Sequence, residues 1–324
     1  MGDASPQDIL IRGGQIAAIG HFAIPKDALR LDAGGRTLLP GFIDSHVHLQ
    51  LSDARQCLRG GTTTVRDLGW TPGVILGRRS ALRVSGPDLL AAGGILCPPG
   101  GYPSRAGWCP ADTAVQVGTP AQAEQAVAAM QASGASIIKV SLPFPQLPEV
   151  VRQAHRRGLK VTAHLGGLEE LDQALAAGVD ELAHFTFSSV RVPEDRIQWM
   201  VAHKVAVCPT LHIGASAQRL DNLGRFVKAG GTVLYGTDLG NYGPPPGIDV
   251  QELQLMQRAG MTPRQVLDSA TSVPARWMGL KDRGAIRVGL RADLILVNGD
   301  PLRDLSCLAP PWKVFYGGDE VGQK

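Results

Sequence analysis

The chain has 324 residues, 44% of them hydrophobic and 19% charged, and its formal net charge is +3. With no basic stretch among aromatic residues, this balance argues against a nucleic-acid partner. The lack of an apolar run of about 18 residues argues against a membrane span. Residues 1–8 lack the basic and apolar regions of a signal peptide, so we expect a soluble cytoplasmic protein. Five scattered cysteines without C-x-x-C spacing argue against a disulfide framework and a thiolate zinc site.

Both ends of the chain are rich in short predicted strands. These strands lie in residues 8–20, where a glycine turn separates two of them, and in residues 30–40, 284–289, 292–297 and 312–316. Because chain ends often lie close together, we expect residues 1–40 and 283–324 to form one composite β-sandwich domain. Residues 41–282 would then form a second, larger domain.

In this larger domain, predicted strands alternate with helices, which favours an α/β fold with a parallel sheet. The predicted strands are Leu38–Asp44, Thr62–Leu68, Asp88–Ala92, Ser136–Ser141, Lys160–His164, Glu181–Phe185, Val205–Thr210 and Thr232–Asp238. The predicted helices include Pro120–Ser133, Glu149–Arg157 and Glu169–Ala177, each with a glycine at or just after its end, the usual stop signal. Eight strands predict a closed (β/α)8 TIM barrel.

Polar residues lie at or near the ends of several predicted strands. His46 and His48 follow the first apolar strand two positions apart, so both side chains point to the same side. Later strands add four more candidates: Lys139, His164, His184 and Asp238. Barrel enzymes keep their chemistry at the carboxyl ends of the strands, so we expect all six residues at one mouth. Imidazole and carboxylate ligands without thiolate favour zinc, with manganese, cobalt or iron as alternatives.

Lys139 is unusual because it interrupts the apolar strand 136–140. Burial and nearby metal charge both favour the neutral amine and can lower a lysine pKa by about 3 to 5 units. A neutral amine can add carbon dioxide to form a carbamate, an anion able to bridge two metals. The hypothesis is that Lys139 is carboxylated in the active protein.

Seven segments together resemble the metal-dependent amidohydrolase superfamily, and within it the imidazolonepropionase-like group that includes Xaa-Pro dipeptidases. They are GFIDSHVH (41–48), GGTTTVRD (60–67), IIK (137–139), TAH (162–164), ELAH (181–184), GTD (236–238) and GLRADLIL (289–296). The resemblance implies a (β/α)8 barrel, a small β-sandwich built from both termini, and two divalent metal ions, zinc first among them. It also implies that His46, His48 and Asp238 hold the more buried ion, that His164 and His184 hold the more exposed ion, and that carboxylated Lys139 bridges both.

The chain also departs from this group. The N-terminal β segment is short, as if one hairpin were missing between Gly14 and Gln15. Relatives with dipeptidase activity often carry a tyrosine in a His-Ala-Tyr-Gly pattern, whereas residues 164–167 read His-Leu-Gly-Gly, so a contact to a substrate carboxylate is missing. Tyr102 stands where many relatives have the histidine of Gly-Gly-His. It is a candidate substrate contact, or else a rim residue.

The implied function is hydrolysis of a carbon–nitrogen (amide or peptide) bond in a small molecule, either a dipeptide of the Xaa-Pro type or an N-acyl amino acid. A hydroxide shared by the metals would attack the carbonyl, and Asp238 would carry the proton to the leaving group. The alternatives are hydrolysis of lactones, carboxylic esters or organophosphorus esters at the same site, a deaminase, and a metal-bearing scaffold without activity. The oligomeric state stays open, and a homo-oligomer is one option.

Two further interpretations concern residues outside the ligand set. His212 follows the seventh strand and is either a substrate contact or a solvated loop residue, the second being favoured. Arg66 and Asp67 at the end of the second strand are expected to form a structural ion pair.

Overall fold

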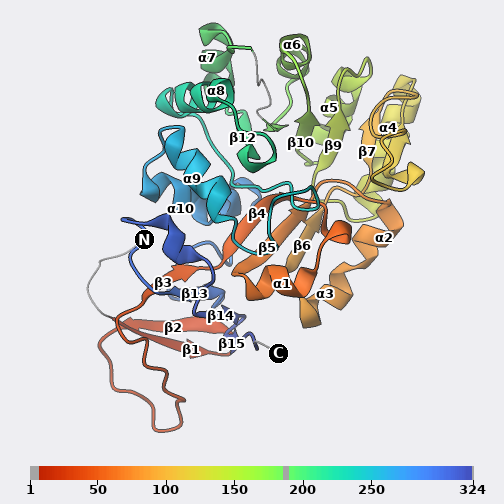
Figure 1. The fold of residues 1–324 in the computed structure, drawn as a ribbon. Coiled ribbons are helices and arrows are strands. Elements are labelled where there is room, and N and C mark those ends of the chain that lie inside the picture. The colour runs from red at the N-terminus through yellow and green to blue at the C-terminus, as the bar shows by residue number, and fades with distance from the viewer. Residues whose placement is uncertain (1–6, 185–189, 323–324) are drawn as a thin grey trace.

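The computed structural model describes residues 7–184 and 190–322. In Figure 1 the strands from the two chain ends lie together at one side of the molecule, next to a larger body of strands and helices formed by the middle of the chain. Among the described residues, no helix combines the length and the apolar character needed to cross a membrane. All five cysteines are free thiols, as expected.

The larger body has a mixed α/β fold with parallel strands. Six strands pair in the order β12-β11-β10-β9-β7-β8, and three others pair in the order β4-β5-β6. Their bounds are Phe42–Val47 (β4), Thr62–Asp67 (β5), Asp88–Ala91 (β6), Ile95–Cys97 (β7), Ala114–Gln116 (β8), Ile138–Ser141 (β9), Val161–His164 (β10), Glu181–Ala183 (β11) and Ala206–Cys208 (β12). Phe185, the last residue of the predicted sixth strand, lies outside the described residues.

The two parallel sheets are joined on both sides by backbone hydrogen bonds. On one side, Ser136 N–H donates to the Ala91 carbonyl at 2.9 Å, which connects β6 to the residues before β9. On the other side, residues 232–239 run between β12 and β4 and bridge both, through Val207 with Val233 and Val47 with Leu239. These residues form no regular strand, so the predicted eighth strand Thr232–Asp238 is present only as isolated bridges.

Helices follow most of the parallel strands, as the alternation predicted. Their bounds are Ala54–Arg59 (α1), Pro72–Gly77 (α2), Arg79–Ser85 (α3), Pro120–Ala132 (α4), Leu147–Arg156 (α5), Leu168–Ala177 (α6), Glu194–Ala202 (α7), Ala217–Lys228 (α8), Val250–Arg258 (α9), Pro263–Ser269 (α10) and Ser272–Trp277 (α11). The three predicted helices are confirmed to within two residues. Helix α4 begins with a capping box between Thr119 and Gln122, and α6 ends at Gly178 in the left-handed conformation that glycine favours.

The terminal strands form two small antiparallel sheets. One pairs β1 (Asp8–Arg12) with β2 (Gln15–Gly20), and the other has the order β15-β14-β13-β3. The strands of the second sheet are Thr37–Pro40 (β3), Leu294–Val297 (β13), Lys313–Tyr316 (β14) and Asp319–Glu320 (β15). The predicted strand 284–289 is wrong, because these residues form turns and irregular backbone around Gly284 and Gly289, both at positive φ.

Gly41 separates the terminal sheet from the parallel strands. The sequence predicted one strand, Leu38–Asp44, but the structure has β3 and β4 with Gly41 between them. Its N–H donates to the Asp293 carbonyl at 2.8 Å, so the chain pairs with β13 before it turns into the larger body. A Cβ atom at this position would lie 2.3 Å from Thr63 Oγ1, which explains why a glycine occupies it.

Candidate metal centre

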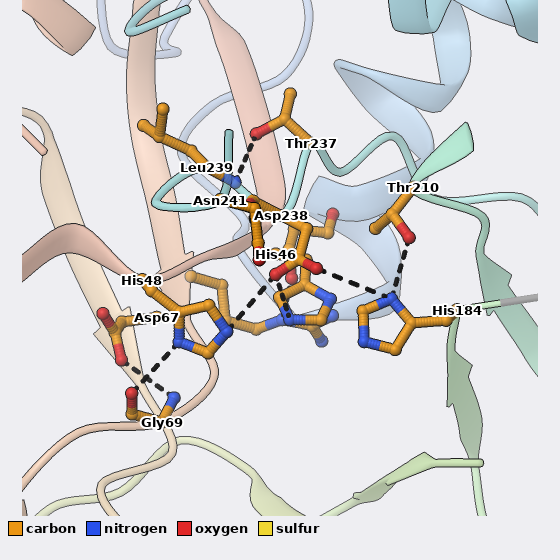
Figure 2. Close-up of polar contacts among 12 residues, drawn as sticks. His46, His48, Asp67, Gly69, His184, Thr210, Thr237, Asp238, Leu239 and Asn241 are labelled. Carbon is orange, nitrogen blue, oxygen red and sulfur yellow. Dashed lines mark hydrogen bonds and ion pairs between the residues drawn. The ribbon is translucent and has the colours of Figure 1, made fainter. Parts of the chain in front are cut away.

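Three residues form the centre of the group shown in Figure 2. His46 and His48 come from the carboxyl end of β4, and Asp238 comes from the neighbouring segment 232–239. Nε2 of each histidine lies 3.3 Å from Asp238 Oδ1. All three side chains are buried, and one ligand atom of each lies within 4.8 Å of the others. This geometry could hold a metal ion.

His184 and His164 lie beside this centre. His184 Nδ1 is 3.9 Å from Asp238 Oδ2 and 2.8 Å from the hydroxyl of Thr210, which fixes the orientation of the ring. The His184 ring centroid is 4.7 Å from that of His46 and 4.9 Å from that of His164. The carboxyl ends of β10 and β11 therefore deliver two more imidazoles next to the first group.

Lys139 lies on β9, which pairs with β7 on one side and β10 on the other. Only 2% of the residue is exposed, and its Nζ has no hydrogen-bond partner within residues 7–184 and 190–322. Burial lowers the pKa of the Lys139 amine to about 8, although the charges of Asp238 and Glu181 oppose this effect. A buried amine without a partner is costly unless another group binds it or reacts with it.

The protonation of the group favours cation binding. Burial holds the pKa of His46 and His184 well below the usual value and lowers that of His164 to about 4. Burial alone would raise the pKa of Asp238, but the histidines around it outweigh this effect and hold the pKa well below its usual range. His48 differs: burial would lower its pKa, but the hydrogen bond to Asp238 and the charge of that carboxylate outweigh burial and raise it. Metal ligation requires an ionised carboxylate and neutral imidazoles, so His48 would release any proton that it holds when a metal ion binds.

Backbone strain is concentrated at this group. Four described non-glycine residues have a positive φ, and three of them are His184 (82°), Thr210 (43°) and Asp238 (57°). Such conformations cost of order 1–3 kcal/mol each and persist only where the surroundings impose them. Here Asp238 N–H donates to the His46 carbonyl at 2.8 Å, and His184 N–H donates to the Cys208 carbonyl at 2.9 Å. Backbone hydrogen bonds to β4 and β12 therefore hold the strained residues in place.

Asp44 connects the two segments of the central group. Its carboxylate accepts the His46 N–H at 3.0 Å, the Thr237 N–H at 3.1 Å and the Thr237 hydroxyl at 2.6 Å. Burial raises the pKa of Asp44 to about 7, against the lowering effect of these hydrogen bonds. An acidic residue inside an apolar strand is the sequence signal for this role.

The loop after β5 orients His48. The Nδ1 atom of His48 lies 3.1 Å from the Gly69 carbonyl. Asp67 accepts hydrogen bonds from the N–H groups of Gly69 at 3.0 Å and Leu49 at 2.7 Å. Contacts of this kind fix the tautomer of an imidazole and leave Nε2 to face the centre. Asp67 thus fixes the loop that orients His48.

The predicted ion pair between Arg66 and Asp67 is wrong. Neighbouring residues of a strand point to opposite faces, so Arg66 turns away from Asp67 and pairs with Glu181 at 2.6 Å, where both side chains are buried. Arg66 Nε also donates to the Ser45 carbonyl at 2.7 Å. This pair connects β5, β11 and the strand that carries His46.

The two candidate substrate contacts have different surroundings. Tyr102 is 44% exposed and stacks on His164, with ring centroids 4.9 Å apart and an interplanar angle of 18°. His212 lies on the short 3-10 helix Leu211–Ile213, and its Nδ1 is 2.6 Å from Asp249 Oδ2. Only 13% of the His212 side chain is exposed, so the favoured interpretation as a solvated loop residue is wrong. Whether His212 touches substrate stays a prediction.

The residues present fit a metal ion by an observation independent of any family. Among the residues that the structure describes, both ring nitrogens of His46, Asp238 Oδ1 and Lys139 Nζ are buried without a hydrogen-bond partner. Native proteins pair nearly all such atoms, so a group of orphans in one place indicates that a ligand completes it. Nitrogen and oxygen donors of this kind suit a divalent metal ion.

Comparison with known proteins gives a family and a fold. The model of the amidohydrolase family matches residues 37–321. An imidazolonepropionase of Deinococcus radiodurans is 27% identical in an alignment that covers 92% of this chain and 87% of that protein. An imidazolonepropionase of Deinococcus deserti is 32% identical, but that match spans 56% of this chain and just under half, 47%, of the relative.

A solved Xaa-Pro dipeptidase with bound methionine superimposes with a TM-score of 0.83 and 24% identity, covering 96% of this chain and 94% of that one. At this identity the likeness establishes the fold. The family model covers most of the chain, including every candidate ligand. The chain therefore belongs to the amidohydrolase family, and as a member it is a hydrolase that acts on carbon–nitrogen bonds.

Proposed function

We propose that the protein hydrolyses the amide or peptide bond of a small substrate, either a dipeptide of the Xaa-Pro type or an N-acyl amino acid. The observation that carries this proposal is the buried group of His46, His48 and Asp238, whose ligand atoms lie within 4.8 Å of one another. The relatives named imidazolonepropionase and Xaa-Pro dipeptidase support the choice of a carbon–nitrogen bond.

The proposed scaffold is a (β/α)8 barrel formed by residues 41–282, with a composite β-sandwich from residues 1–40 and 283–324. The bridges from residues 232–239 to both β12 and β4 support closure on one side. The contact between β6 and the residues before β9 supports it on the other. In such a barrel the carboxyl ends of the strands form the active-site mouth.

The proposed cofactor is a pair of divalent metal ions, with zinc as the proposed metal. His46, His48 and Asp238 would hold one ion, His164 and His184 the other, and carboxylated Lys139 would bridge them. Bound metal ions of this kind polarise a carbonyl and lower the pKa of water to about 7, which supplies a nucleophile at neutral pH. The unpaired, buried Lys139 amine supports the carbamate, which forms when the neutral amine attacks carbon dioxide and releases a proton.

Asp238 has the properties of a proton carrier. The surrounding histidines keep its pKa low, so the carboxylate is ionised at neutral pH and can accept the proton of the attacking water. Transfer of that proton to the departing amine would complete the reaction, and such catalysis typically contributes about 10² to 10⁴ in rate. The fixed backbone at Asp238, with its N–H on the His46 carbonyl, keeps the carboxylate in place.

The test is elemental analysis combined with a substrate screen of the metal-loaded protein. Two metal ions per chain, with turnover of dipeptides or N-acyl amino acids, would support the proposal. Turnover of lactones or phosphotriesters but not of amides would replace it with ester chemistry. One ion per chain would contradict the binuclear site, and metal binding without turnover of either class would favour a scaffold. A signal from ¹³C-labelled carbon dioxide on Lys139 would test the carbamate by NMR.

A further inference from the structure

Three aromatic residues form a wall beside the candidate ligands. This aromatic wall consists of Trp70, Tyr102 and Trp108. The Trp108 ring lies 4.7 Å from the ring of His48, and Tyr102 lies 4.9 Å from His164. Trp108 is 6.3 Å from Trp70 and 6.4 Å from Tyr102, measured between ring centroids. The wall therefore runs from one side of the ligand group to the other.

The loops that carry the wall are held in place by hydrogen bonds. Trp70 lies after β5, and Tyr102 and Trp108 lie in the loop after β7. Turns within that loop are closed by the N–H groups of Gly101, Ser104 and Ala106, each donating at 2.9 Å to a carbonyl three residues earlier. The Thr71 hydroxyl donates to Asp112 at 2.8 Å, which fastens the Trp70 segment to the end of the loop. A wall built this way is formed before any substrate arrives.

The wall offers flat apolar faces and one buried polar group. Trp70 packs against the buried cluster around Val47 and Leu49. Its ring centroid lies 6.3 Å from that of Trp108, so Trp70 connects Trp108 to the core. Tyr102 is 44% exposed although its ring stacks on a candidate ligand, so a large aromatic surface stays open to an incoming molecule. The Trp108 indole nitrogen is buried and lies next to the Tyr102 hydroxyl, which links the two rings. Burial raises the pKa of that hydroxyl, and the contact with Trp108 opposes the rise.

We propose that the aromatic wall selects substrates that carry a flat apolar ring next to the bond to be cleaved. A ring stacked on Trp108 or Tyr102 would sit beside His48 and His164, and so next to the reacting atoms. Aromatic pairs contribute binding energy beyond the area that they bury. The substrate class named here rests on the proposed amide hydrolysis, but the ring preference itself is a property of the binding surface.

The first test measures binding rather than turnover. Phenylphosphonate and methylphosphonate differ only in the ring, and their affinities for the zinc-loaded protein can be measured by calorimetry. We expect wild type to bind phenylphosphonate about tenfold more tightly, which corresponds to about 1.4 kcal/mol. In Trp108→Leu this ratio should fall to about 2 or 3. A ratio near 1 in wild type, or an unchanged ratio in Trp108→Leu, would overturn the wall.

Matched variants separate the contributions. Trp108→Phe keeps an aromatic ring at this position, so it should retain most of the ring preference. Trp312→Leu removes a tryptophan beside β14, which stacks with Arg36 outside the site, and should leave the ratio unchanged. If Trp108→Leu fails to fold, Tyr102→Leu at the exposed position gives the same comparison. A tenfold ratio that survives in Tyr102→Leu and in Trp108→Leu alike would assign the preference to other residues.

The second test separates this inference from the proposed function. Wild type should hydrolyse N-benzoyl-proline with a higher kcat/KM than N-acetyl-proline, and Trp108→Leu should lower that ratio mainly through KM. If the protein discriminates between the phosphonates but hydrolyses neither amide, the result would support the ring preference of the wall and contradict the proposed function. If kcat/KM is equal for both amides and the phosphonates bind equally, the result would support the proposed function and contradict the ring preference of the wall.

Discussion

Two polar clusters of this molecule are built in opposite ways. In the candidate metal centre, His46, Asp238 and Lys139 are buried with polar atoms that have no hydrogen-bond partner in the described part of the chain. In the second cluster both oxygens of Asp88, at the start of β6, are paired. Oδ1 accepts the Tyr316 hydroxyl at 2.8 Å, and Oδ2 accepts hydrogen bonds from Arg283 and Arg291.

The difference indicates what each cluster does. Burial would raise the pKa of Asp88, but Arg283 and Arg291 outweigh it and lower the pKa, so the carboxylate is ionised and satisfied by the protein alone. It fastens a strand of the parallel sheets to β14 and to the residues before β13. The candidate metal centre contains charged and polar atoms without a partner in the described part of the chain. Its backbone strain is the energetic cost of keeping these side chains in position for a ligand. The Asp88 cluster stabilises the fold, and the candidate metal centre is suited to bind a ligand.

The largest expected effect comes from the same substitution in each cluster. Asp238→Asn should lower kcat by about 10² to 10⁴, because the amide cannot carry the proton, while the protein stays folded. Asp88→Asn should leave kcat per folded molecule within about twofold. Steady-state kinetics on both variants, with circular dichroism to confirm folding, measures the contrast. Equal kcat in Asp238→Asn and wild type would remove Asp238 from the chemistry.

The next largest effect separates the clusters by metal binding. A ligand present at about 100 times its Kd stabilises a protein by about 2.7 kcal/mol. Zinc added to the chelator-treated protein should therefore raise Tm by several degrees in wild type and in Asp88→Asn. In His46→Asn the shift should be much smaller, because a central ligand is gone. The measurement is differential scanning fluorimetry, and an undiminished shift in His46→Asn would place the metal elsewhere.

Much of this architecture could be predicted from the sequence, and the failures have physical causes. Strand and helix alternation placed β5, β6, β9 and α4 to within two residues. Residues 232–238 look like a strand by composition, but the centre needs Asp238 at positive φ and the close approach of Gly236 to Cys208 and His46, and both interrupt a regular ladder. The break at Gly41 depends on contact with Thr63, which no local pattern contains.

The candidate site was predictable only in part. Histidines at the ends of apolar strands stand out, so His46, His48, His164 and His184 could be named without a structure. The partners of polar residues could not be named, since Arg66 reaches Glu181 across 115 positions of sequence. The aromatic wall was missed for the same reason, because Trp70 and Trp108 come from different loops and meet only in the fold.

The Asp88 cluster should matter for stability. Asp88→Ala leaves Arg283, Arg291 and the Tyr316 hydroxyl without their shared acceptor. Arg283 keeps its ion pair with Asp282 and Arg291 keeps its ion pair with Asp293, but the loss of one partner of a partly buried charge is still costly. We expect a loss of about 1–3 kcal/mol in unfolding free energy. Urea denaturation of the chelator-treated protein measures it. Asp319→Ala on the exposed strand β15 serves as the control and should change stability little. A loss no greater than that of the control would mean that the satisfied cluster does not stabilise the fold.

The smallest effect concerns Glu252, a buried acid on α9 whose Oε2 accepts the His212 N–H at 2.7 Å while Oε1 has no partner. Burial raises the pKa of Glu252 from 4.5 to about 8, so the folded protein keeps a proton that the unfolded chain has already lost between these values. Stability therefore falls as pH rises from about 4.5 to about 8 and levels off above. Between pH 6 and pH 7 the unfolding free energy of wild type should fall by about 1 kcal/mol relative to Glu252→Gln. Glu169→Gln, at an exposed position of α6, should track wild type. Denaturation without metal at both pH values decides the point: parallel behaviour of wild type and Glu252→Gln would show that Glu252 is ionised in the fold, and that this acid belongs with Asp88 among the satisfied charges.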